Sequence, residues 1–171
     1  MKPSLLVVSL IFWTPWLAVA QDRPDATTPS WKVGTAVARI TPQRRLHMRG
    51  YASRKTPAEG TEQDLFGKAI VIEDAQGQRV VFITLDLIGV LAELRTRVEK
   101  EVQEKYQLPP HCLLMNASHT HCGPAYGRED ARDYFDSLAT NLVKIVGQAI
   151  ERLEPASLTY SQARCSVAMN R

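Results

Sequence analysis

The alternation of apolar and polar residues predicts a hairpin in the first half of the chain. Lys68–Glu73 and Arg79–Asp86 are rich in apolar and β-branched residues, and the polar segment Asp74–Gly77 between them predicts a turn. A further strand is expected over Lys32–Ile40, where Thr41-Pro42 ends it. The second strand of the hairpin is almost continuously apolar, which is typical of a sheet that is covered on both faces.

Two longer segments have apolar residues at helical spacing. They predict helices over Leu91–Tyr106 and Arg132–Leu153. Between them the apolar segment Cys112–Ala117 predicts another strand, which makes a βαβ unit with the strand at Arg79–Asp86. A last strand is expected over Ser157–Arg164. The pattern therefore predicts an α/β fold, in which a mixed sheet with a hairpin and a βαβ unit is covered by helices.

The first residues have the features of an export signal. A positive residue and an apolar stretch precede the small residues Ala18-Val19-Ala20, which are typical of a cleavage site. We therefore expect a signal peptide over residues 1–20, a flexible leader over 21–31 and a domain over 32–171. This predicts a secreted or periplasmic protein, with an uncleaved N-terminal anchor as the alternative. No segment after residue 20 is long and apolar enough to span a membrane.

The charge pattern bears on possible partners, and the cysteine spacing bears on metal sites and disulfides. The formal net charge is +3, and no basic block is interleaved with aromatic residues, so a nucleic acid partner is not expected. The basic residues of the N-terminal half are interpreted as a solvated surface; they are Arg39, Arg44, Arg45, Arg49, Arg54 and Lys55. The three cysteines fit no zinc-finger spacing, and in an oxidising compartment one pair can close.

His119 and His121 are the leading candidates for chemistry. They follow the expected strand at Cys112–Ala117, and open α/β sheets bind ligands at the carboxyl ends of their strands. In extended backbone two such residues project to the same side, with their Cα atoms roughly 6.5 Å apart. The pair is therefore predicted to reach one metal ion or one substrate oxygen, and ordinary loop or core histidines are the alternative.

Two other segments are expected near the histidines. Asp86 ends the neighbouring strand, so it lies at the same edge of the sheet and can accept an N–H from an imidazole. The alternative is that Asp86 caps the loop or the following helix. Arg44–Gly60 is a long segment rich in charge, glycine and proline, and long loops in compact domains are often functional.

Several segments, taken in order, carry a resemblance to a known family. They resemble an opening strand, a Met-x-Gly-Tyr-Ala loop, a first hairpin, a Ser/Thr-His-Thr-His-Ser-Gly-Pro signature and a Val-Gly-x-Asn-Arg segment. These features are found in the N-terminal part of the neutral/alkaline non-lysosomal ceramidase family. The matching segments are Val33–Pro42, Met48–Ala52, Lys68–Ile72, Val80–Asp86, Ser118–Pro124 and Val167–Arg171, so the similarity covers nearly all of residues 32–171.

The resemblance implies an exported, zinc-dependent amidohydrolase that cleaves the N-acyl bond of ceramide or another lipid amide. It implies that His119 ligates zinc and that His121 is a catalytic residue lining the active site. Asp86, Gly50 and Tyr51 are candidates for contacts with the substrate or for support of the histidines. The remaining zinc ligands of the family lie beyond the matched segments. We therefore expect an incomplete domain that is not active alone. The alternative is a non-catalytic exported α/β domain that binds a ligand or a partner.

Overall fold

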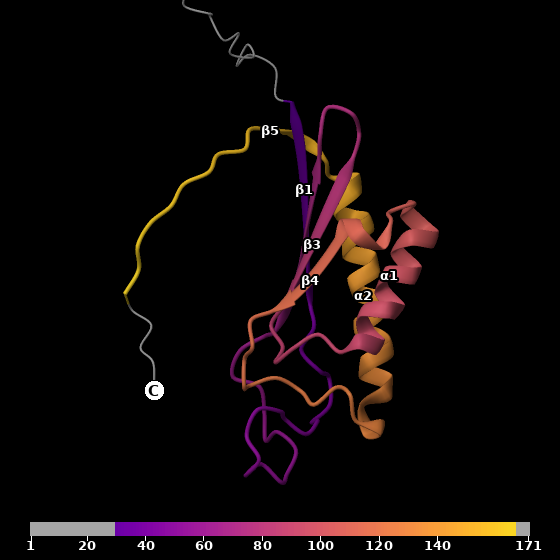
Figure 1. The fold of residues 1–171 in the computed structure, drawn as a ribbon. Helices are drawn as coiled ribbons and strands as arrows, with labels where there is room; N and C mark the ends of the chain where they lie inside the picture. The colour runs from indigo at the N-terminus through magenta and orange to yellow at the C-terminus, as the bar shows by residue number, and fades with distance from the viewer. Residues whose placement is uncertain (1–29, 167–171) are drawn as a thin grey trace, which may run out of the picture.

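The computed structural model describes residues 30–166, in which one mixed sheet carries two helices on one face (Figure 1). The strands are β1 (Trp31–Arg39), β2 (Phe66–Glu73), β3 (Arg79–Leu85), β4 (Leu113–Ala117) and β5 (Glu154–Ala156). The helices are α1 (Ala92–Tyr106) and α2 (Arg132–Glu151), with short 3₁₀ turns at Pro110–Cys112 and Glu129–Ala131. The strand order is β4-β3-β2-β1-β5, and only β3 and β4 are parallel within these residues. This confirms the predicted α/β class, the hairpin and the βαβ unit.

The turn of the β2–β3 hairpin is stabilised by Asp74. Its carboxylate accepts hydrogen bonds from the backbone N–H groups of Gln76 at 2.9 Å and Gln78 at 2.8 Å. Gly77 has a φ of +79°, which side chains with a β carbon disfavour. The polar residues predicted as a turn therefore fix the register in which β2 and β3 pair.

The core lies between the sheet and the two helices. Helix α1 buries the residues expected from its spacing, and α2 is buried along most of its length because it packs against both the sheet and α1. Gly34 of β1 permits this close packing, since a β carbon there would overlap the carbonyl oxygen of Ala149 in α2. The largest fully buried side chains are Phe135, Ile83, Leu85, Leu87, Leu94, Leu138, Leu142, Ile145, Val71, Val81, Val98 and Val102.

Within residues 30–166 the helices cover only one face of the sheet, so cover on the other face stays a prediction. Along β3, Val81 and Ile83 are buried, whereas Val80 and Phe82 are 43% and 36% exposed. The sheet register pairs Phe82 with Ile70 of β2 and Leu114 of β4, which makes an apolar row across the outer face. A continuous apolar run does not reveal which of its alternate residues face a covering layer.

The last strand lies earlier than predicted, at Glu154–Ala156 instead of Ser157–Arg164. It pairs with β1 from Val33 to Trp31, the first residue of β1. Beyond that pair no strand continues the ladder, so residues 157–166 have no regular structure. Trp31, expected in the leader, belongs to β1.

Parts of the predicted organisation lie outside the described residues. They are the signal peptide at 1–20, most of the leader at 21–31 and the Val167–Arg171 segment. Neither of the two α-helices between residues 30 and 166 combines the length and the hydropathy needed to cross a membrane. The three cysteines, Cys112, Cys122 and Cys165, are all unpaired.

Candidate functional site

Three loops meet where β3 and β4 end, at the bottom of Figure 1. One follows β3 (residues 86–91), one follows β4 (118–128) and the third joins β1 to β2 (40–65). Backbone hydrogen bonds join the last two loops: Arg49 N–H donates to Gly123 O at 3.1 Å, and Ala125 N–H donates to His47 O at 2.7 Å. The loops therefore form one connected surface at the carboxyl ends of the parallel strands.

The two histidine rings lie side by side in the loop after β4. The ring centroids of His119 and His121 are 5.0 Å apart, with an angle of 67° between the ring planes. The sequence predicted extended backbone at this pair, but the backbone is not extended here, because His119 has a φ of +60°. This left-handed residue turns the chain, and the hydroxyl of Thr120 accepts a hydrogen bond from Cys122 N–H at 3.2 Å. The rings are neighbours because of this turn and not because of strand geometry.

The ring of His119 is held by the loop after β3. Its Nδ1 is 2.6 Å from the carbonyl oxygen of Ile88. Because a carbonyl oxygen only accepts hydrogen bonds, Nδ1 carries the proton, and Nε2 of the neutral ring keeps its lone pair. Histidines that ligate metals commonly have this arrangement, in which one nitrogen donates to a carbonyl and the other faces the metal.

Asp86 lies at the predicted edge of the sheet but does not hold an imidazole. Its Oδ2 accepts a hydrogen bond from the backbone N–H of Phe66 at 3.0 Å, at the start of β2. The expectation that Asp86 accepts the imidazole N–H was wrong, because the Ile88 carbonyl occupies that position on His119. The carboxylate instead accepts from a backbone group of the neighbouring strand β2, so the alternative, a cap on the loop or the following helix, is not what this bond makes.

Gly50 and Tyr51, which the resemblance of Met48–Ala52 to a family motif made candidates, lie against His121. Gly50 has a φ of +117°, and a β carbon there would lie 2.6 Å from both Cβ and Cγ of His121. The ring centroids of Tyr51 and His121 are 5.0 Å apart, with an angle of 77° between the ring planes. This edge-on contact is a favoured geometry for aromatic pairs. The glycine is required because the backbone of residue 50 approaches the imidazole directly.

Arg54 is a site residue that the sequence interpretation missed. Its guanidinium donates hydrogen bonds to the carbonyl oxygens of Arg49, at 3.2 Å, and of His121. The guanidinium carbon also lies 4.8 Å from the centroid of the Tyr51 ring. Arg54 had been assigned to a solvated basic surface. Only its position three residues after Tyr51, in a loop already suspected of function, could have singled it out.

Tyr126 joins the loop after β4 to the loop after β3. Its buried hydroxyl donates to Gly89 O at 2.7 Å and accepts from Leu91 N–H at 2.9 Å. Burial raises the pKa of this hydroxyl, so it stays protonated and keeps donating. Tyr126 thereby fixes Gly89 and Leu91, which directly follow Ile88, the anchor of His119.

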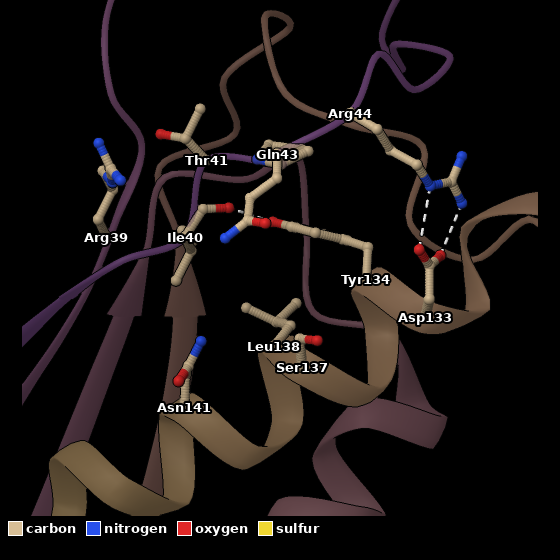
Figure 2. Close-up of a pocket in the computed structure, with 11 residues that line it drawn as sticks. Arg39, Ile40, Thr41, Gln43, Arg44, Asp133, Tyr134, Ser137, Leu138 and Asn141 are labelled. Atoms are coloured by element: carbon tan, nitrogen blue, oxygen red, sulfur yellow. Dashed lines mark hydrogen bonds and ion pairs between the residues drawn. The ribbon is translucent and has the colours of Figure 1, made fainter.

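A separate cavity of about 420 Å³ lies beside the N-terminal half of α2 (Figure 2). The hydroxyl of Tyr134 donates to Ile40 O at 2.7 Å across it, and burial raises the pKa of that hydroxyl. At its rim, hydrogen bonds from Arg44 lower the pKa of Asp133 to about 2. The cavity is lined by Arg39, Ile40, Thr41, Pro42, Gln43, Arg44, Asp133, Tyr134, Ser137, Leu138 and Asn141. The histidine pair is not among its lining residues, so the cavity is distinct from the histidine site.

The histidine site offers part of a metal-binding set. Among residues 30–166, no three His, Cys, Asp or Glu side chains come together in a way that could hold a metal ion. A catalytic zinc has three protein ligands and keeps one position for water or substrate. His119 has the free nitrogen and the carbonyl anchor expected of one such ligand, and His121 is its nearest imidazole neighbour.

Comparisons with known proteins agree on one family. Residues 31–171 match the family model that describes the N-terminal part of the neutral/alkaline non-lysosomal ceramidases. Neutral ceramidase A of Dictyostelium discoideum is 27% identical over 147 residues, which are 78% of this chain and 21% of that protein. The neutral ceramidase of Pseudomonas aeruginosa is 26% identical over 171 residues, covering 92% of this chain and 25% of the other. The neutral ceramidase of Drosophila melanogaster is 33% identical over 98 residues, covering 56% and 14%.

The fold agrees with these sequence matches. The crystal structure of the neutral ceramidase from Pseudomonas aeruginosa superposes with a TM-score of 0.67 and 25% sequence identity, covering 75% of this chain and 22% of that chain. The chain therefore spans a quarter or less of the length of these relatives, which is consistent with an incomplete domain. On the family match over residues 31–171 and the shared fold, the chain belongs to the neutral/alkaline non-lysosomal ceramidase family, in its N-terminal region.

Proposed function

We propose that this chain is the N-terminal part of an exported, zinc-dependent amidohydrolase that cleaves the linear amide bond of an N-acylsphingosine or a related lipid amide. The observation that carries the proposal is the paired imidazoles of His119 and His121 at the carboxyl ends of β3 and β4, in a member of the ceramidase family. Residues 1–20 act as the signal peptide in this proposal, and the product is secreted or periplasmic.

In this proposal His119 is a zinc ligand through Nε2. The hydrogen bond from Nδ1 to Ile88 O supports that role, because it fixes the ring and makes the other nitrogen a better donor to a metal. A zinc ion held by His119 and further ligands would supply polarisation of the amide carbonyl and a water whose pKa is lowered from about 15.7 to about 7. Since one or two imidazoles do not complete a catalytic zinc site, the remaining ligands come from outside residues 30–166, and we propose that this chain is not active alone.

His121 and Tyr51 are proposed to handle the substrate. The ring of His121 lies beside His119, where a ring nitrogen can hold a proton for the amide and orient it. Tyr51 is 55% exposed and presents an aromatic surface next to His121. An apolar acyl chain is the kind of ligand that such a surface takes up.

The alternative is a non-catalytic exported domain that binds a ligand or a partner. The observation that favours it is the number of metal donors, because two imidazoles and no third ligand gather within the described residues. A domain of this kind binds zinc weakly or not at all. The two proposals therefore differ in whether zinc binding depends on His119.

The test is zinc binding by the full chain, measured by calorimetry for wild type, His119→Ala and His111→Ala. His111 is an exposed histidine before β4, away from the loop after β4, and serves as the matched control. We expect the affinity for zinc to fall at least about tenfold in His119→Ala and to stay unchanged in His111→Ala. Equal binding of zinc by all three proteins would favour the non-catalytic alternative. Release of fatty acid from N-acylsphingosine by the chain alone would contradict the proposed incompleteness.

A further inference from the structure

Arg54 makes three contacts around His121. The guanidinium of Arg54 donates to the backbone carbonyl of His121 and to that of Arg49, and it lies over the ring of Tyr51. The ring of Tyr51 in turn packs edge-on against the His121 ring. Arg54 therefore touches the main chain of His121 directly and its side chain through one aromatic ring.

We propose that Arg54 is the positioning residue for the imidazole of His121. The inference rests on the proposed function, in that it assigns a role within the site that contains His119 and His121. Arg54 does not reach the reacting atoms in this proposal. It acts by keeping Tyr51 in its edge-on contact with His121 while holding the backbone of the histidine loop in place.

The reason that a positioning residue is needed lies in how the two histidines are anchored. His119 is held from the loop after β3, through Ile88 O. His121 is held from the loop between β1 and β2, through Gly50, Tyr51 and Arg54. Because the two rings have different anchors, their relative placement depends on both loops. The distance of 5.0 Å between the ring centroids persists only if the second loop is held as firmly as the first.

Arginine suits this position better than other residues. A planar guanidinium stacks on an aromatic face and still presents several N–H donors at its edge. At this position it uses both properties, with Tyr51 on its face and two carbonyl oxygens at its edge. A lysine ammonium keeps the positive charge over the ring, but it is a point charge on a flexible side chain and has no planar group to stack. Lysine therefore replaces arginine only in part.

The experiment is an NMR measurement on the full chain, labelled so that the ring protons of Tyr51 and His121 are resolved, at one fixed and mildly alkaline pH. The wild type is expected to show a ring-to-ring cross-relaxation signal and a ring-current shift of the His121 ring protons caused by Tyr51. Arg54→Met is expected to lose both signatures, and Arg54→Lys to keep part of them. Arg95→Met is the control, since Arg95 pairs with Glu99 on the exposed side of α1.

Loss of the signatures in Arg54→Met, with partial retention in Arg54→Lys and none of the effect in Arg95→Met, supports the proposal. Wild-type signatures in Arg54→Met overturn it. If Arg54→Met does not fold, Arg54→Gln is measured instead: it keeps a donor for the carbonyl and removes the charge over Tyr51, and wild-type signatures there also overturn the proposal. The experiment measures ring geometry, so its outcome does not depend on whether the chain binds zinc or hydrolyses an amide. A failure of the zinc or hydrolysis test can therefore be told apart from a failure of this one.

Discussion

Gly50 packs directly against His121, with no room for a β carbon between them. An added β carbon would lie 2.6 Å from Cβ and Cγ of the imidazole, and the φ of +117° already disfavours any other residue. Two separate physical effects therefore select glycine at this position. One is conformational, and the other is steric and specific to the histidine.

The two effects can be separated by comparing Gly50→Ala with Gly77→Ala. Gly77 also has a positive φ, of +79°, but nothing lies within 4 Å of an added β carbon there. We expect Gly77→Ala to lower the free energy of unfolding by about 1 kcal/mol, which is the conformational cost alone. Gly50→Ala is expected to cost about 3 kcal/mol, because steric overlap is added. Urea denaturation measures both, and equal losses would contradict the packing of residue 50 on His121.

A buried carboxylate makes stability depend on pH. Glu73 is 6% exposed and accepts hydrogen bonds from Lys32 at 2.9 Å and Arg79 at 2.7 Å. The bond from Lys32 is the largest cause of a lowered pKa, followed by that from Arg79. Because the folded pKa lies below the unfolded one, the stabilisation is present above the ordinary value of 4.5 and is lost as the pH falls through the folded pKa.

Glu73→Gln should therefore remove a stabilisation of about 2 kcal/mol at neutral pH and flatten the loss of stability in acid. The exposed residue Glu104 provides the control, since Glu104→Gln should leave the pH profile of the unfolding midpoint unchanged. Parallel acid profiles for wild type and Glu73→Gln would show that the pair with Lys32 and Arg79 does not stabilise the fold.

The bare face of the sheet should make the isolated chain associate. Phe82 and Leu114 are register neighbours on this face, and both are exposed. Replacing both by threonine puts β-branched side chains, which favour strands, at the two positions, so the cost to folding should be about 1 kcal/mol. We expect sedimentation velocity to show less self-association in this double variant than in wild type, because exposed apolar patches drive association. Asn116→Ser, a polar change on the same face, is the control, and an identical distribution for the double variant would contradict the prediction.

Tyr126 should control the order of the loop that holds His119. Tyr126→Phe leaves the N–H of Leu91 and the carbonyl of Gly89 without their partner, which should lower stability by about 1–2 kcal/mol. Hydrogen exchange of the Leu91 amide should become faster. Tyr160→Phe is the matched control because Tyr160 is 89% exposed. If the Leu91 amide exchanges as slowly in Tyr126→Phe as in wild type, the hydroxyl does not hold the loop.

Periodicity was sufficient to predict most of the fold. Helices α1 and α2 and strands β2 and β3 lie close to their expected ranges, because burial of one face imposes a period that the sequence shows. The pattern did not show that one face is exposed within residues 30–166, because Val80 and Phe82 are as apolar as the buried residues Val81 and Ile83 that alternate with them. Strand β5 was misplaced because a strand of three residues is defined by its partner and not by its own pattern.

The site was predictable as far as residue types allow. His119 and His121 stood out by their spacing at the end of a strand, and Gly50 and Tyr51 by their motif. The anchor of His119 is a backbone carbonyl, that of Ile88, and a backbone group leaves no signature in the sequence. Arg54 was missed because its role depends on a fold that brings residues 54 and 121 together. Without that fold, a charged residue in a loop indicates a solvent-exposed position.

The length of strand β1 separates residues 30 and 157 from the histidine site. Trp31 pairs with Ala156, so residues 30 and 157 leave the sheet at the same corner, and the loops around His121 lie at the opposite end. A strand of nine residues is about 30 Å long. A tether attached at residue 30 would therefore hold the molecule with its imidazoles at the end of the sheet that is far from the attachment point. Immobilisation of the chain on a chip or a bead through that end would leave the site open to a substrate in solution.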